Sequence, residues 1–210
     1  MSLPLVALSD THLGEPTSVL EFPEGRARLA EALSKLVAQH SDDGKVEEVV
    51  LIGDIPDRTL ASHAQIRAST RAFIHVLVST LRPERIVYLP GNHDHTLWSR
   101  MVDSIGSLAH PQSKCTDASG WQLVRRGEAP IDDFDSPGTG TGDGKKHLIE
   151  LFVDPMLPCP FEFVVANPVY VRTFPGRSGS FVFTHGTHFR SDVAAPKGLL
   201  DFLTKTLIDE

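Results

Sequence analysis

The chain has 210 residues, of which 40% are hydrophobic and 22% charged, as is ordinary for one globular domain with a buried core. Its formal net charge of −7 argues against a surface built to bind nucleic acid. The N-terminus lacks the basic region of a signal peptide, and no apolar run approaches the roughly 20 residues that span a bilayer, so we expect a cytoplasmic protein without a membrane span.

The first half of the chain alternates apolar strands with amphipathic helices. The strands are predicted over residues 3–8, 46–52 and 85–89, and they are apolar enough to be buried in a parallel sheet. Helical periodicity predicts helices over residues 24–39, 62–81 and 96–108. Right-handed crossovers would make the strands parallel and bring their carboxyl ends to one edge of the sheet.

A polar group able to bind metal follows each of these strands. Asp10 and His12 follow the first strand, Asp54 follows the second, and Asn92 and His93 follow the third. Any one of these groups could simply be a turn whose Asn or Asp side chain bonds the local backbone. Three such groups at one edge of a sheet are harder to explain as turns, and this favours a site.

The periodic pattern is lost between residues 109 and 147, where Gly and Pro cluster. We expect this region to be an insertion that forms a cap with a flexible tip, and the alternative is a mobile loop. It would lie within a single domain that covers residues 1–210. The cysteines, Cys115 and Cys159, form no C-x-x-C pair, and we expect two unrelated thiols in a reducing compartment.

Order returns in the last third of the chain. Residues 161–166 and 169–174 are predicted to form a short strand pair, and residues 180–184 another core strand. That core strand leads directly into His185 and, three residues on, His188. A final amphipathic helix is predicted over residues 197–208.

Collected, the strand ends offer carboxylates, an amide and imidazoles. They come from Asp10, His12, Asp54, Asn92, His93, His185 and His188. Such mixed oxygen and nitrogen sets suit Mn²⁺, Fe, Zn²⁺ or Mg²⁺ rather than a cysteine-rich structural zinc. One carboxylate can bridge two ions about 3.5 to 4 Å apart, as in the two-metal sites of phosphatases and nucleases. Asp54, which is central among the strands, is the candidate for the bridge.

At this point a family resemblance is clear. The chain resembles the calcineurin-like metallophosphoesterases, whose first four motifs match Asp10-x-His12, Gly53-Asp54-x-x-Asp57, Gly91-Asn92-His93-Asp94 and His185-Gly186. The resemblance covers residues 3–107 well and residues 180–189 locally. It implies an α/β fold of the αββα-sandwich type, in which two packed mixed sheets are flanked by helices.

The resemblance also implies two divalent metal ions, with Mn²⁺ favoured over Fe, Zn²⁺ and Mg²⁺. Asp10 and His12 would hold the first ion, Asp54 would bridge both, and Asn92 and His185 would hold the second. In the family's fifth motif, Gly-His-x-His, each metal gains one further His, but this chain contains no such motif. We expect that motif to lie beyond Glu210; the alternatives are that water or His188 completes the site, or that nothing does.

Three further residues take catalytic roles by the same resemblance. His93 would act on the phosphate or on the leaving-group oxygen, as an electrostatic stabiliser or a general acid. Asp57 would orient His93 and set its charge. Apart from these catalytic roles, we expect Asp94 to brace the loop. Arg58 matches a phosphate-binding Arg in the pattern Gly-Asp-x-x-Asp-Arg, against the alternative of a solvated surface Arg, but Thr59 stands where that pattern has Gly.

The function implied is a metal-dependent phosphoesterase. It would hydrolyse a small-molecule phosphomonoester or phosphodiester by in-line attack of a metal-bridging hydroxide, without a covalent phosphoenzyme. One alternative is a catalytically inactive scaffold or interaction protein of the same fold. The other is a nuclease with the same dimetal chemistry, which would need a basic groove that the acidic balance does not favour. The sequence leaves the substrate and the oligomeric state open.

Overall fold

A computed structural model describes residues 2–95, 115–116, 120–125, 152, 161–167, 169–174 and 179–186. The predicted helices over residues 96–108 and 197–208 lie outside the described residues, as do His188 and most of the expected insertion. No helix in the described part of the chain is long and apolar enough to cross a membrane.

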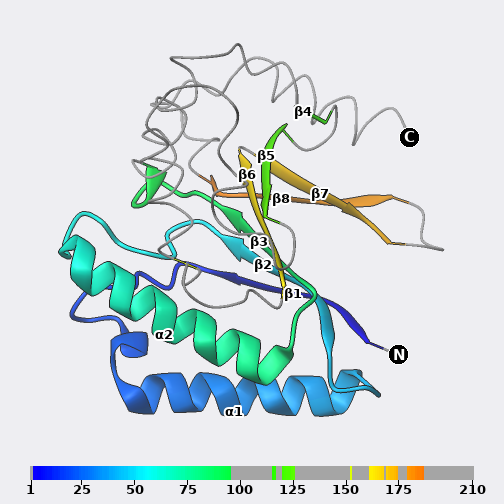
Figure 1. Cartoon of the computed structure of the whole chain (residues 1–210), viewed down its shortest axis with the longest axis horizontal. Helices are drawn as coiled ribbons and strands as arrows, with labels where there is room; N and C mark the ends of the chain where they lie inside the picture. Colours follow the sequence, from blue (N-terminus) through cyan, green and yellow to red (C-terminus); the bar gives the residue numbers. More distant parts are fainter. Residues whose placement is uncertain are drawn as a thin grey trace.

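A mixed sheet forms the centre of the fold (Figure 1). Its strand order is β1-β2-β3-β6-β5-β4, in which the first four strands run parallel, β5 pairs antiparallel with β6, and β4 pairs antiparallel with β5. The bounds are β1 Leu3–Ser9, β2 Val46–Ile52, β3 Arg85–Leu89, β4 Cys115–Thr116, β5 Gly120–Arg125 and β6 Glu162–Asn167. The parallel order of the first three strands, predicted from the sequence, is confirmed.

The helices α1 (Pro23–His40) and α2 (His63–Leu81) cover the same face of this sheet (Figure 1). This follows from the strand order, because two right-handed crossovers that step in the same direction along a sheet put both helices on one side. A short 3₁₀ helix, η1 (Val19–Glu21), precedes α1. The amino end of α2 is fixed by a capping box between Ser62 and Gln65.

The main core lies between these helices and the sheet. Buried side chains of α2 meet buried side chains of the strands, namely Phe73, Leu77 and Leu81 against Val49, Leu51, Ile86, Tyr88 and Phe163. Burial of an aliphatic or aromatic side chain contributes roughly 1.5 to 3 kcal/mol. This core holds the parallel strands in register, and so it also fixes where their carboxyl ends lie.

Phe73→Ala is expected to destabilise the chain by about 3 to 5 kcal/mol, because it leaves a cavity beneath the sheet. Urea unfolding followed by circular dichroism would measure the loss. His75→Ala is the matched control, since His75 is exposed on the same helix, and we expect a change within about 0.5 kcal/mol. A similar effect of the two substitutions would contradict the assignment of this core.

A second, two-stranded sheet lies against the opposite face of the main sheet. Strands β7 (Val169–Thr173) and β8 (Ser180–Thr184) pair antiparallel. Tyr170 and Phe183 contact a second apolar cluster built on Val50, Val87, Leu89 and Val164. His185 directly follows β8, so this packing brings His185 to the edge of the main sheet where β1, β2 and β3 end.

The predicted strand pair of residues 161–166 and 169–174 is wrong. Both segments form strands, but β6 joins the main sheet between β3 and β5, whereas β7 pairs with β8. Only one residue separates β6 from β7, and the tightest common hairpin needs a two-residue loop. The chain therefore passes from one sheet to the other at this point. The described residues show an α/β fold with a four-stranded parallel sheet flanked by helices, and the full αββα sandwich stays a prediction.

Candidate metal centre

The strand ends meet at one edge of the sheet and are tied together through their backbones. The Asp10 amide donates to the Gly53 carbonyl at 3.2 Å, and the His12 amide donates to the Asp54 carbonyl at 2.9 Å. The Gly53 amide donates to the Leu89 carbonyl at 2.7 Å. The loops that carry the polar motifs thus continue the ladder of the sheet, which places their side chains on a rigid support.

Three of the predicted metal ligands have left-handed backbone conformations. Asp10, His12 and Asp54 have φ values of 52°, 46° and 50°, a region that residues with a Cβ atom seldom adopt. Among the described non-glycine residues, Arg82 alone shares this conformation, and it ends α2 as its C-cap. Backbone strain of this kind costs about 1 to 3 kcal/mol per residue and concentrates at functional sites.

Asp54 is the centre of the cluster. Asp10, His12 and Asp54 each offer a ligand atom, and these atoms all lie within 4.8 Å of one another. His185 joins them, because its Nε2 lies 3.4 Å from Asp54 Oδ2 and 4.0 Å from Asp10 Oδ1. The other Asp54 oxygen, Oδ1, accepts a hydrogen bond of 2.8 Å from the His93 amide. Strands β1, β2 and β8 and the turn after β3 therefore all contribute to one group.

The electrostatics of the cluster favour a buried negative charge. Burial raises the pKa of Asp54, but hydrogen bonds from His185 and from the His93 amide outweigh it and hold the pKa below its usual value. The hydrogen bond to Asp54 raises the pKa of His185 in spite of burial. Asp54 is only 4% exposed, and its Oδ2 lies beside the His185 imidazole. A carboxylate group of this kind fits a divalent cation.

Two glycines make the close approach possible. A Cβ atom on Gly91 would overlap the Asp54 carboxylate, and a Cβ atom on Gly53 would overlap the His185 ring. Gly53 also has a positive φ of 61°, which glycine adopts without strain. The glycines in the Gly-Asp and Gly-Asn-His-Asp motifs are therefore required by side chains that pack directly on their backbones.

Gly91→Ala is expected to weaken Mn²⁺ binding by about 10- to 100-fold, because the added methyl group displaces the Asp54 carboxylate. Isothermal titration calorimetry of the full chain would measure the affinity. Gly44→Asn is the control, since Gly44 has a φ of +69° in open space and Asn tolerates that conformation. Unchanged Mn²⁺ affinity in Gly91→Ala would contradict the role given to this close approach.

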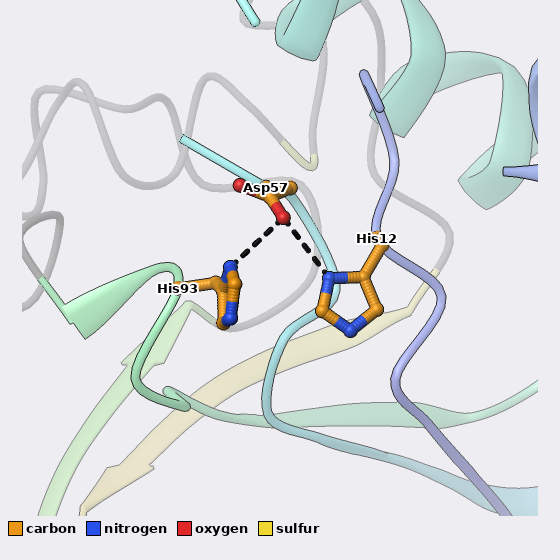
Figure 2. A group of neighbouring side chains, drawn as sticks. All are labelled: His12, Asp57 and His93. Carbon is orange, nitrogen blue, oxygen red and sulfur yellow. Dashed lines mark hydrogen bonds and ion pairs between the residues drawn. The ribbon is translucent and has the colours of Figure 1, made fainter. Parts of the chain in front are cut away.

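A second polar group adjoins the first through His12 (Figure 2). One oxygen of Asp57, Oδ2, lies 3.0 Å from His12 Nδ1 and 2.8 Å from His93 Nδ1. Asp57 is buried. The two rings meet edge to face, with their centroids 4.8 Å apart. This trio of Asp57, His12 and His93 could itself hold a metal ion, but contacts of this length are also those of an ion-paired carboxylate.

Asp57 is ionised at neutral pH. Burial raises its pKa, but hydrogen bonds from Thr59 and His12 outweigh burial and lower the pKa to about 2. An ionised carboxylate only accepts hydrogen bonds, so the hydrogen bond of 3.0 Å from His12 requires a proton on His12 Nδ1. Nε2 is then the His12 atom that could bind a metal ion, and outer carboxylates orient metal-bound histidines in this way.

Asp94 braces the turn after β3, as the sequence led us to expect. Its buried carboxylate accepts hydrogen bonds from the Gly91 amide and, at 3.2 Å, from the Ile55 amide. Burial raises the pKa of Asp94 to about 6. Asp94 therefore joins the loop after β3 to the loop after β2. His95, at the end of this turn, is exposed.

Three predicted residues remain, namely Asn92, Arg58 and His188. Asn92 is exposed on the turn after β3. Arg58 is partly exposed, and its amide donates to the His93 carbonyl at 3.4 Å, so it lies beside the Asp57 group. His188 falls outside the described residues. Sequence reasoning missed Thr59, which appeared only as a departure from Gly. The signal that could have found it is Asp57 itself, because an Asp side chain commonly accepts a hydrogen bond from the backbone two residues on.

A comparison with known families agrees with this geometry. The family model for calcineurin-like phosphoesterases matches residues 3–187. No curated protein and no solved structure matches the chain.

Proposed function

The chain belongs to the calcineurin-like phosphoesterase family, and from that premise we propose that it is a dinuclear metal-dependent phosphohydrolase acting on a small-molecule phosphomonoester or phosphodiester. The observation that carries the proposal is the convergence of Asp10, His12 and Asp54 within 4.8 Å, with His185 against Asp54. Strained backbone at three of these residues supports an active enzyme over an inactive scaffold, because strain brings a packing module no benefit.

The ligands divide between two sites. Asp10 and His12 would hold one ion, Asn92 and His185 the other, and Asp54 would serve both; His188 is a further candidate ligand. Mn²⁺ is the ion we favour, and the carboxylate and amide oxygens are ligands that suit it. When bound, such ions neutralise charge on the phosphoryl oxygens and lower the pKa of water.

His93 would handle the leaving group. Asp57 Oδ2 lies 2.8 Å from its Nδ1, so the Asp57 carboxylate would orient the ring. Nε2 is then free to donate a proton to the departing oxygen or to stabilise charge on the phosphate. Arg58, which follows Asp57 in the loop after β2, would bind a phosphoryl oxygen through its guanidinium group.

The test is hydrolysis of p-nitrophenyl phosphate and bis(p-nitrophenyl) phosphate by the purified full chain. We expect turnover in Mn²⁺ and none after removal of the metal with EDTA, with recovery when Mn²⁺ is restored. The ratio of the two rates separates monoesterase from diesterase activity. If neither substrate shows metal-stimulated turnover with Mn²⁺, Fe²⁺, Zn²⁺ or Mg²⁺, the proposed function is wrong.

A further inference from the structure

We propose that Thr59 is a positioning residue, which sets the Asp57 carboxylate so that one of its oxygens serves two histidines at once. The inference rests on the proposed function, because it concerns the same site. Thr59 stands where the family pattern Gly-Asp-x-x-Asp-Arg is followed by Gly. The side chain that Gly lacks makes a contact in this chain.

Thr59 holds one side of the Asp57 carboxylate at two points. Its hydroxyl donates to Asp57 Oδ1 at 2.5 Å, and its amide donates to the same oxygen at 2.8 Å. A Gly at this position would keep the amide contact and lose the hydroxyl contact. Two donors on one oxygen fix the rotation of the carboxylate as well as its place.

The other oxygen, Oδ2, then faces His12 and His93 together. It accepts a hydrogen bond of 3.0 Å from His12 Nδ1. The His93 Nδ1 contact is shorter, at 2.8 Å, but it lies off the hydrogen-bond direction. A small rotation of the carboxylate would favour one histidine and lose the other. The Thr59 hydroxyl opposes that rotation. Through the Asp57 carboxylate it therefore acts both on His12, the predicted metal ligand, and on His93, the predicted acid.

Two consequences follow for a chain without the hydroxyl. The His12 ring loses its fixed orientation, which weakens metal binding, because the outer partners of a metal-bound histidine set its direction. The His93 ring loses its place beside Asp57, which lowers kcat. A residue that only stabilises the turn would change neither quantity once the chain is folded.

The experiment compares Thr59→Val, which removes the hydroxyl at similar volume, with Thr59→Ser, which keeps it. Two properties are measured: Mn²⁺ affinity by calorimetry, and kcat and KM for p-nitrophenyl phosphate. We expect Thr59→Val to weaken Mn²⁺ binding and lower kcat by about 3- to 10-fold each, the range for one hydrogen bond of ordinary net strength, and Thr59→Ser to restore both.

Thr17→Val is the matched control. The Thr17 hydroxyl also donates to a carboxylate two residues earlier, Glu15 Oε1, at 2.5 Å on an exposed loop, and we expect no change in either property. A second control is Thr59→Val combined with Asp57→Asn. It should be no worse than Asp57→Asn alone, because Thr59 acts only through Asp57. Additive losses in the double variant would overturn the proposal.

A readout on the metal-free chain separates this proposal from the proposed function. Long-range ¹H–¹⁵N NMR of the histidine rings should show Nδ1 protonated in His12, with the ring signals of His12 and His93 shifted in Thr59→Val and neither shifted in Thr17→Val. If the wild-type chain shows no hydrolysis, the proposed function fails while the ring signals and the Mn²⁺ affinity still decide on Thr59. Unchanged ring signals and unchanged Mn²⁺ affinity in Thr59→Val would overturn the positioning role.

Discussion

Asp54→Asn is expected to lower kcat by about 10³-fold or more and to weaken Mn²⁺ binding by at least about 100-fold, because it removes the shared charge of the cluster. Asp54 is buried, contacts His185 and lies within reach of Asp10 and His12. The substituted amide still offers an oxygen to the His93 amide, so the turn after β3 should keep its place. Steady-state kinetics and calorimetry measure the two effects.

The control for this substitution is Asp42→Asn, in an exposed turn away from the cluster, which should leave both properties within two-fold of the wild type. Circular dichroism should show that Asp54→Asn is folded. A folded Asp54→Asn chain that keeps wild-type Mn²⁺ affinity and turnover would show that the cluster is not a metal centre.

His93→Ala is expected to lower kcat by about 10² to 10⁴-fold while Mn²⁺ affinity changes little, because His93 is proposed to act on the substrate and not on the metal. The choice of leaving group separates its two possible roles. If His93 is a general acid, phenyl phosphate should suffer a larger loss than p-nitrophenyl phosphate, whose leaving group needs less protonation. An equal loss on both substrates indicates electrostatic stabilisation.

His40→Ala provides the control, since His40 is exposed at the end of α1 and should leave the kinetics unchanged. A His93→Ala chain with near-normal turnover of phenyl phosphate would contradict the catalytic role of His93. A large loss of Mn²⁺ affinity in that chain would instead make His93 a metal ligand, in line with its contact to the Asp57 group.

Much of the fold could be predicted because local patterns and tertiary packing agree. The apolar run of residues 46–52 and the helical period of residues 62–81 each match a described element within one residue. Parallel order followed from the alternation of strands and helices. The strand pairing of residues 161–166 could not be predicted in the same way. Proximity in the sequence suggested residues 169–174 as the partner, but β6 pairs with β3 and β5. Pairing depends on which open strand edge lies nearest in space, and the sequence alone does not give this.

The candidate site shows the same division. The residue types and their places after strands were enough to gather Asp10, His12, Asp54, His93 and His185. The sequence could not show that one Asp57 oxygen contacts two histidines, or that Thr59 fixes it, because both depend on side-chain rotation. It also could not show that three predicted ligands adopt positive φ, since neither Asp nor His requires it.

If Asp10, His12, Asp54 and His185 bind divalent metal, the metal-free full chain should take up Mn²⁺ in a calorimetric titration. We expect saturable binding of at least one Mn²⁺ per chain, reversed by EDTA, weakened by at least about 100-fold in Asp54→Asn and intact in Asp42→Asn. Absence of saturable binding to the folded wild-type chain, or equal binding by Asp54→Asn, would contradict it.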